Sequence, residues 1–220
     1  MAAQTSHPHA PDHCLQTPPG SIQTIIFDLG KVIVDFDHMA ICRRLAQFCQ
    51  HTPENIHTSI FASGLEADFD CGLISPEKFF GTAADNLTLT LDIERFKNAW
   101  NTIFTLNRGT EQIIRQLKPR YRLLCLSNTN LWQFEYCRQQ YPVLKLFNEF
   151  ILSYEVGQRK PEPEIYHQAL QTAEAPAESC LYIDDIREYV DTAQRLGLQA
   201  RRFTSAATLA DDLRALNILT

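Results

Sequence analysis

The sequence predicts an α/β fold, in which a parallel β-sheet is covered by helices on both faces. From residue 108 to the end of the chain, helical and strand patterns alternate, which is typical of a parallel sheet with right-handed crossovers. Before that, a strand over 25–27 is followed by a long segment whose apolar side chains recur at helical spacing. We therefore expect one sheet with a helical segment inserted after its first strand.

The first strand is short and apolar, and it leads directly to a carboxylate. Ile25, Ile26 and Phe27 precede Asp28, and Gly30 opens the turn that follows. Ligands of open α/β sheets gather at the carboxyl ends of the strands. An Asp at this place is therefore better explained by reactivity or metal binding than by packing.

The inserted segment, 37–107, holds no convincing strand, and we predict that it is helical. Thr52-Pro53 and Ser75-Pro76 each place an N-cap residue before a proline at the first helical position. These two pairs mark two helix starts.

The rest of the chain is predicted to alternate to its end. Strands are expected over 122–126, 150–153, 180–183 and 199–203, and helices over 110–117, 131–140, 163–172, 187–196 and 206–216. Asn130 is in position to cap the helix that begins at residue 131.

Composition limits the class of protein. The chain has 220 residues, 45% of them hydrophobic, which suits one large domain or a core with an insertion. Its net charge of −6 disfavours nucleic acid or an anionic membrane as a partner, and no apolar stretch is long enough to span a membrane. The seven cysteines form no Cys-x-x-Cys pair, so a reducing cytoplasm is expected. Residues 1–21 are rich in Pro and His and are expected to form a disordered tail.

Polar groups follow the predicted strands in four places. In chain order they are Asp28, Ser127 with Asn128, Lys160 before Pro161, and Asp184 with Asp185. With helix-length spacers between them, these motifs resemble the four motifs of the haloacid dehalogenase superfamily, and the likeness runs from about residue 22 to about residue 203. The Asp-Leu-Gly form of the first motif is similar to that of a subgroup, within subfamily IA, that includes sugar-1-phosphate phosphatases.

The resemblance implies a fold and a domain division. In this superfamily the four motifs occupy neighbouring strand ends of one Rossmann-like sheet. We therefore expect a Rossmann-like core over 22–36 and 108–220, and a small helical cap over 37–107.

Three motifs are expected to carry out phosphoryl transfer. Asp28 is the expected nucleophile, because an ionised carboxylate can attack phosphorus and so divide a difficult hydrolysis into two easier steps. Ser127 and Asn128 are expected to bind the transferred phosphoryl group at the N-terminus of the following helix. Lys160, placed by the proline after it, is expected to offset the negative charge of nucleophile and phosphate.

The acidic pair is expected to bind a metal together with the nucleophile. Two unit charges about 4 Å apart repel by roughly 4 kcal/mol at an effective dielectric constant of about 20, so three neighbouring carboxylates need a cation. Mg²⁺ prefers oxygen ligands and usually takes one or two carboxylates together with phosphate oxygens. The resemblance adds the backbone carbonyl of Gly30, so we expect Mg²⁺ at Asp28, Gly30, Asp184 and Asp185.

Gly30 also marks a departure from many phosphatases of the superfamily, which carry an Asp there to protonate the leaving oxygen and later activate water. Such help is worth about 10²- to 10⁴-fold in rate. One substitute is Asp35 or Asp37; alternatively, a leaving group of low pKa, such as that of a sugar 1-phosphate, needs the acid less. Tyr189 stands where many relatives have a small polar or acidic group, and its role is left open.

We therefore expect a Mg²⁺-dependent hydrolase of a small phosphorylated metabolite, such as a sugar phosphate or a nucleotide-type monoester, acting through an aspartyl phosphate on Asp28. Two alternatives stay open: a 2-haloacid dehalogenase-type hydrolase, in which Asp28 attacks carbon without a metal, and a catalytically weak binding or regulatory protein of the same fold. The expected partner is the small substrate, with no nucleic acid and no membrane. The expected state is a monomer or a homodimer in the cytoplasm.

Overall fold

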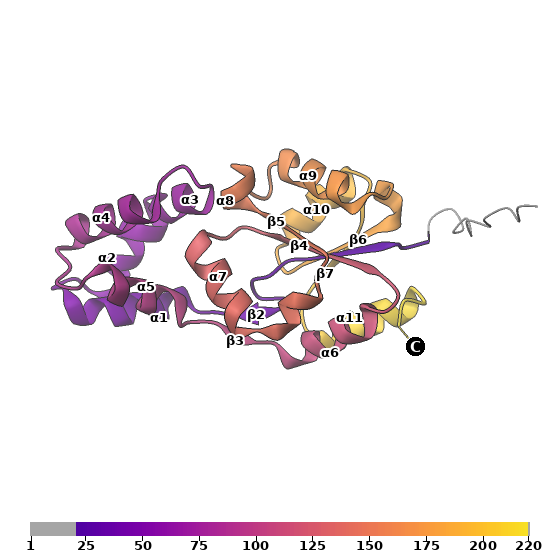
Figure 1. Ribbon diagram of the computed structural model, residues 1–220, viewed down its shortest axis with the longest axis horizontal. Coiled ribbons are helices and arrows are strands. Elements are labelled where there is room, and N and C mark those ends of the chain that lie inside the picture. Colours follow the sequence, from indigo (N-terminus) through magenta and orange to yellow (C-terminus); the bar gives the residue numbers. More distant parts are fainter. Residues whose placement is uncertain (1–20, 220) are drawn as a thin grey trace, which may run out of the picture.

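The computed structural model describes residues 21–219, so the predicted tail, 1–21, lies outside the described residues except for its last position. A five-stranded sheet lies at the centre, with the strand order β5-β4-β1-β6-β7 (Figure 1). The strands are β1 (Thr24–Phe27), β4 (Arg122–Ser127), β5 (Glu149–Leu152), β6 (Cys180–Asp184) and β7 (Gln199–Arg202). Each neighbouring pair runs parallel. The predicted α/β class with a Rossmann-like parallel sheet is confirmed.

Side chains that alternate along the strands build a separate core on each face of the sheet. The covering helices are α6 (Arg108–Leu117), α7 (Leu131–Gln140), α9 (Pro163–Ala173), α10 (Arg187–Arg195) and α11 (Ala206–Ala215). Ile25 and Phe27 of β1 pack in one cluster with α6, α7 and α11. Ile26, which lies between them in sequence, packs in the other cluster with α9 and α10. Because the strands are buried from both sides, their sequences are continuously apolar rather than alternating.

A second group of helices lies beside the sheet rather than on its faces (Figure 1). Its members are α1 (His38–Leu45), η1 (Ala46–Phe48), α2 (Pro53–His57), η2 (Thr58–Ala62), α3 (Leu65–Asp70), α4 (Pro76–Leu87) and α5 (Ile93–Asn101). They enclose a third core of their own, which Trp132 of α7 joins from the sheet side. That this group is a cap with the boundaries 37–107 stays a prediction.

Side-chain caps fix the helix starts that the sequence marked. The hydroxyls of Thr52 and Ser75 accept hydrogen bonds from backbone N–H groups in the first turns of α2 and α4. Asn130 does the same for α7, where its side chain accepts from the N–H of Gln133 at 3.1 Å. These caps satisfy N–H groups that have no partner inside the helix.

Two short strands were not predicted. β2 (Val34–Asp35) and β3 (Thr105–Leu106) pair antiparallel where the chain leaves the sheet and returns to it. The expectation that 37–107 holds no strand was therefore wrong at its end, because two residues cannot display an alternating pattern and the pairing is long-range. Three further short helices, also absent from the predicted elements, are η3 (Pro142–Leu146), α8 (Ser153–Val156) and η4 (Ala177–Ser179).

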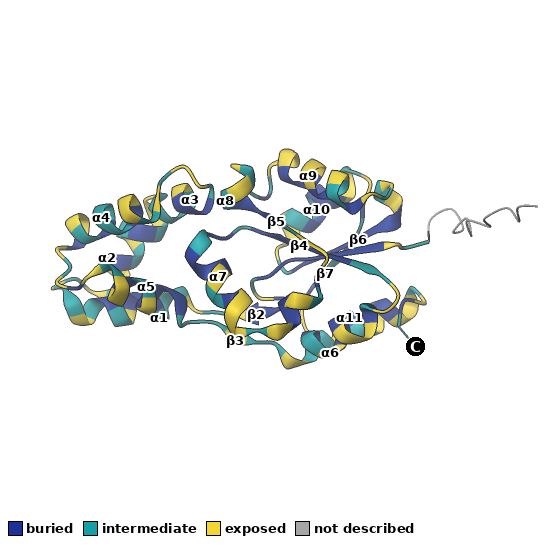
Figure 2. Ribbon diagram, viewed as in Figure 1, coloured by how far each residue is buried: buried dark blue, intermediate teal, exposed yellow. Residues whose placement is uncertain are grey.

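Burial follows the same layers, with buried strands inside and exposed helix faces outside (Figure 2). The large hydrophobic side chains exposed within the described residues are Leu73 and Ile186. Over residues 21–219, no helix is both long and apolar enough to cross a membrane.

Candidate active site

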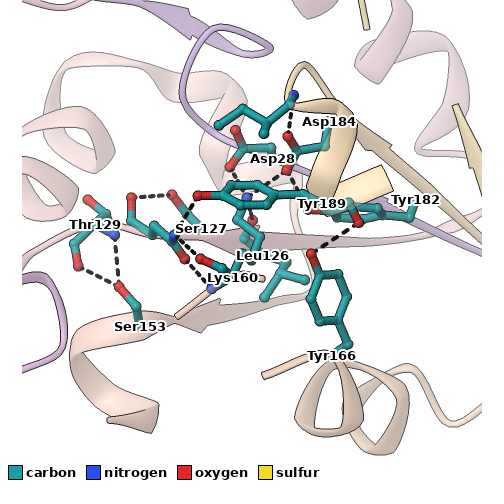
Figure 3. A network of polar contacts seen from close by, with 12 residues as sticks. Asp28, Leu126, Ser127, Thr129, Ser153, Lys160, Tyr166, Tyr182, Asp184 and Tyr189 are labelled. Atoms are coloured by element: carbon teal, nitrogen blue, oxygen red, sulfur yellow. Dashed lines mark hydrogen bonds and ion pairs between the residues drawn. The ribbon is translucent and has the colours of Figure 1, made fainter. Parts of the chain in front are cut away.

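The carboxyl ends of the three central strands bring the predicted polar groups together. Ser127 ends β4, Asp28 follows β1 and Asp184 ends β6, and these strands are neighbours in the sheet. Lys160 reaches the same place from the loop between α8 and α9, as Figure 3 shows. All of the predicted site residues except Asp184 line one cavity, and Asp184 lies buried behind it.

Lys160 lies at the centre of this cluster. Its Nζ is 2.7 Å from Asp28 Oδ1 and 2.7 Å from Asp184 Oδ2, and it donates a third hydrogen bond to the carbonyl of Leu126 at 3.1 Å. An ammonium has three N–H donors, so all of them are used. The side chain is 1% exposed, and it is therefore a fully partnered buried cation.

Tyrosine rings surround the ammonium of Lys160. The ring centroids of Tyr189 and Tyr182 lie 5.1 Å and 5.9 Å from Nζ, within the range of a cation–π contact. The hydroxyl of Tyr189 lies 3.4 Å from Asn128 Nδ2, which donates to it, and the ring also lines the cavity. Tyr189, whose role the sequence left open, therefore covers the cation and faces the ligand space.

Both carboxylate oxygens of Asp184 already have partners. Oδ2 accepts hydrogen bonds from Lys160 and from the hydroxyl of Tyr182, and Oδ1 accepts one from the backbone N–H of Ile186 at 2.8 Å. The residue is 0% exposed. These contacts suit a carboxylate that orients Lys160 and the start of α10.

The carboxylates carry more negative charge than Lys160 balances. Burial, partly offset by Lys160, raises the pKa of Asp28 to about 7, and the charge of Asp184 adds to the effect. Burial also raises the pKa of Asp185. Burial opposes the charge of Lys160, but Asp184 and Asp28 outweigh it and raise the pKa of the ammonium. A further cation would therefore be stabilised here.

The donor set fits a magnesium ion. One carboxylate oxygen each from Asp28, Asp184 and Asp185 lie within 4.8 Å of one another. Hard oxygen ligands of this kind suit Mg²⁺. Asp184 is buried and engaged by Lys160 and Ile186, whereas Asp28, Asp185 and Gly30 border the cavity and are therefore the more open to a metal.

The two residues of the second motif, Ser127 and Asn128, make different kinds of contact. Asn128 binds the backbone of Lys160 from both sides: its Oδ1 accepts from the N–H at 2.8 Å, and its Nδ2 donates to the carbonyl at 2.9 Å. Ser127 is 2% exposed, and its hydroxyl makes one long contact of 3.4 Å to the carbonyl of Asn128. The Ser127 hydroxyl is therefore available to a ligand, whereas the Asn128 amide already positions Lys160.

Position 30, two residues after Asp28, cannot hold a side chain unless Phe36 moves. A Cβ on Gly30 would lie 2.8 Å from Cε1 of Phe36. The two carboxylates considered as substitutes, Asp35 and Asp37, do not line the cavity. Asp37 instead caps α1 and pairs with Arg43 at 2.5 Å, which holds its pKa below the usual value. The structure thus argues against both as the missing acid.

The cavity has a volume of about 280 Å³, and part of its wall comes from residues that the sequence did not single out. They include His38, Glu66, Asp70, Thr129 and Gln133. Asp70 is 5% exposed and accepts a hydrogen bond from Asn130 Nδ2 at 2.9 Å. No local pattern marks Glu66 and Asp70, because α3 reads Leu-Glu-Ala-Asp-Phe-Asp, which is equally typical of a solvated acidic helix.

Comparison with known proteins gives related enzymes. Among curated proteins, the chain is 24% identical over 185 residues to D-ribitol-5-phosphate phosphatase from Bacteroides thetaiotaomicron, covering 81% of this chain and 90% of that protein. A solved haloacid-dehalogenase-family enzyme from the same organism, in complex with magnesium and inorganic phosphate, has a TM-score of 0.76 at 24% identity, covering 84% of this chain and 96% of that one. L-2-haloacid dehalogenase from Xanthobacter autotrophicus has a TM-score of 0.62 at 18% identity, covering 90% of this chain and 85% of that one.

A family model described as haloacid dehalogenase-like hydrolase matches residues 22–197, which is most of the chain. The match spans all four motifs and the inserted helices. The predicted resemblance is confirmed, and the chain belongs to the haloacid dehalogenase-like hydrolases.

Proposed function

We propose that this protein is a magnesium-dependent phosphatase of a small phosphorylated metabolite, and that it acts through an aspartyl phosphate on Asp28. One observation carries the proposal: one oxygen of Asp28 is held by Lys160 while the residue borders a cavity that Asp185 and Ser127 also line. The phosphatase among the curated relatives supports the reaction class, and the magnesium and phosphate complex of a structural neighbour supports the cofactor.

In the first half-reaction, the free oxygen of Asp28 attacks phosphorus and forms a new P–O bond. The bond from phosphorus to the substrate alcohol breaks, and the leaving oxygen takes up a proton. Lys160 offsets the charge of the nucleophile, and Ser127 with the N–H groups before α7 binds the phosphoryl oxygens. In the second half-reaction, water attacks phosphorus, the bond to Asp28 breaks, and inorganic phosphate leaves.

The acidic residues have two further roles, metal binding and the positioning of Lys160. Asp28 and Asp185 would hold the metal, with the carbonyl of Gly30, and Asp184 positions Lys160 through its buried ion pair. Magnesium, when bound there, supplies positive charge that stabilises the phosphate oxygens during the transfer. The helices α1 to α5, as a cap over the core, exclude water from the cavity.

The cavity favours a small substrate. Its volume of about 280 Å³ lies just below the range that ligand pockets usually occupy, about 300–1,000 Å³. Its wall carries several groups that can bind hydroxyls, such as Gln133 and Thr129. These features favour a sugar or polyol phosphate over a larger nucleotide-type monoester.

The proposal is tested by phosphate release from sugar phosphates, polyol phosphates, nucleotides and p-nitrophenyl phosphate, each with magnesium and with chelator. We expect magnesium-dependent release that Asp28→Asn abolishes. Asp85→Asn, on the exposed side of α4, is the matched control and should keep full activity. A radiolabelled phosphoryl group trapped on the wild-type protein by acid quenching, and absent from Asp28→Asn, would identify the covalent intermediate.

The same experiment separates the two alternatives. Release of halide from 2-haloacids without magnesium, and no phosphate release, would replace the proposal with a dehalogenase, whose likeness in the comparisons is one of fold. Binding of phosphate esters without turnover would show a binding or regulatory protein.

A further inference from the structure

The proposed reaction needs a proton donor that the strand ends do not provide. An alcohol leaves phosphorus as a strongly basic oxygen unless a proton is delivered to it, and such help is worth about 10²- to 10⁴-fold. Gly30 has no side chain, and Phe36 occupies the space where one would lie. In an in-line displacement the leaving oxygen lies on the side of phosphorus away from the nucleophile. The donor must therefore come from the part of the cavity wall that lies away from Asp28.

Glu66 of α3 has the properties that such a donor requires. It is partly buried in the cavity wall, and it comes from the inserted helices rather than from the sheet. Its carboxyl group makes no hydrogen bond or ion pair with any other residue in the part of the chain that the structure describes. No hydrogen bond within the described residues holds this carboxyl group, so a ligand that enters the cavity can form one with it.

Five other titratable groups of the wall are less suitable. Burial lowers the pKa of His38 to about 4, so this residue is a neutral imidazole at pH 7 and a poor acid. The donors of Lys160 are all used, and Arg159 does not release its proton. Asp70 is 5% exposed and already accepts from Asn130. The hydroxyl of Tyr189 lies beside Asn128 and over Lys160, on the side of the nucleophile.

We propose that Glu66 protonates the leaving oxygen in the first half-reaction and takes a proton from the attacking water in the second. This inference rests on the proposed phosphatase function. As the bond between phosphorus and the leaving oxygen breaks, the proton of the Glu66 carboxyl passes to that oxygen, and Glu66 becomes a carboxylate. Water then enters the same position, gives its proton to Glu66 and bonds to phosphorus as the bond to Asp28 breaks. Both proton transfers occur on one side of phosphorus, so one group can perform both.

The charges around Glu66 suit this cycle. Burial raises the pKa of Glu66, and the charge of Arg159 partly offsets the rise. The charge of Glu66 in turn adds to the effect of burial in raising the pKa of Asp70 on the same helix. Glu66 is thus protonated over a wider pH range than an exposed glutamate, while Arg159 keeps the carboxylate form accessible.

The test compares leaving groups in Glu66→Gln. Values of kcat/KM report the first half-reaction, in which the alcohol leaves, and p-nitrophenolate needs no proton whereas a sugar alkoxide does. We expect kcat/KM for a sugar 6-phosphate to fall at least about 100-fold and kcat/KM for p-nitrophenyl phosphate to change less than about threefold. Because water activation is also lost, p-nitrophenyl phosphate should show a burst of product equal to the enzyme concentration, followed by slow turnover. Glu77→Gln, on the exposed start of α4, is the matched control.

Three outcomes would overturn the inference: equal losses on both substrates, a change in KM alone, which would make Glu66 a group that binds substrate hydroxyls, or no loss at all. A leaving-group dependence found in Tyr189→Phe instead would transfer the role to that hydroxyl. Magnesium-dependent turnover of p-nitrophenyl phosphate by the wild type tests the phosphatase function separately, so the two failures cannot be confused. Circular dichroism of each variant shows that it is folded.

Discussion

The carboxylates on the two sides of the cavity differ in their partners. At the strand ends, Asp28 and Asp184 share the ammonium of Lys160 at 2.7 Å each. On α3, Glu66 and Asp70 form no ion pair with any described residue within 4.0 Å. The strand-end side is therefore preformed by ion pairs, whereas on the helical side Glu66 is left for a ligand to bind and the Asp70 carboxylate has only the neutral amide of Asn130 as its partner among the described residues. Such a division suits an enzyme in which the sheet fixes the chemistry and the inserted helices respond to the substrate.

Removal of the shared cation, Lys160, should lower the stability of the folded protein most. Lys160→Met would leave two buried carboxylates without their partner, and breaking a buried pair in this way costs about 3–5 kcal/mol. Burial already holds the folded pKa of Asp28 at about 7, above the unfolded value of about 3.9, and loss of the ammonium raises it further. The deficit in the free energy of unfolding should therefore be small below about pH 7 and grow as the pH rises above that value.

Urea unfolding of Lys160→Met and wild type between about pH 4 and pH 8, without magnesium, measures this deficit. Lys145→Met, an exposed lysine of η3, is the matched control and should show no pH-dependent deficit. A deficit in Lys160→Met that does not change with pH would show that packing, rather than charge, accounts for the loss.

The same contrast explains how much could be predicted from the sequence. Asp28 and Asp184 each follow or end an apolar run of strand residues, so a local pattern places them at one edge of the sheet. Glu66 and Asp70 lie on the same six-residue helix as Asp68, which is exposed, and nothing in the sequence separates the two that line the cavity from the one that does not.

Tertiary contacts also decided details at the strand ends. The role of Asn128 as a phosphate ligand stays a prediction, but no pattern in the sequence indicates that its side-chain amide binds the backbone of Lys160, thirty-two residues later in the chain. The strand β3 has two residues and forms because β2 lies beside it, which no local pattern records. Strand ends can be predicted because the signal is local; these contacts depend on pairings between distant segments.

Asp70→Asn should change the pH dependence of stability, because it removes an ionisable group from the helical side while keeping the hydrogen bond from Asn130. Burial raises the pKa of Asp70 well above its usual value. The folded protein therefore binds this proton more tightly than the unfolded chain, so wild-type stability falls as the pH rises from the ordinary carboxyl value. Each unit of pKa difference corresponds to about 1.4 kcal/mol. The variant should be more stable than wild type near pH 8 and should lose this advantage near pH 4.

Urea unfolding of Asp70→Asn across this pH range measures the effect, and Glu111→Gln serves as a control of opposite sign. Arg115 and Arg108 hold the pKa of Glu111 below its usual value, so that substitution should cost more at high pH than at low pH. If the free energies of unfolding of Asp70→Asn and wild type changed with pH in the same way, the ionisation of Asp70 would not affect stability. The two sides of the cavity would then not differ in the way described.

Gly30→Ala should have the smallest effect on stability, and it tests the contact between position 30 and Phe36. The new Cβ would lie 2.8 Å from Cε1 of Phe36, a half-buried ring that also lines the cavity. Because the contact involves the far end of a side chain, the ring can turn, and we expect a loss of about 1 kcal/mol, at the low end for overpacking. In the Phe36→Leu background the loss should vanish, so a double-mutant cycle measured by urea unfolding should give a coupling close to the whole cost. An equal loss in both backgrounds would mean that the backbone, rather than Phe36, excludes a side chain at position 30. If the coupling is found, the ring and a side chain at position 30 compete for one volume, and a proton donor cannot occupy that position while Phe36 forms part of the cavity wall.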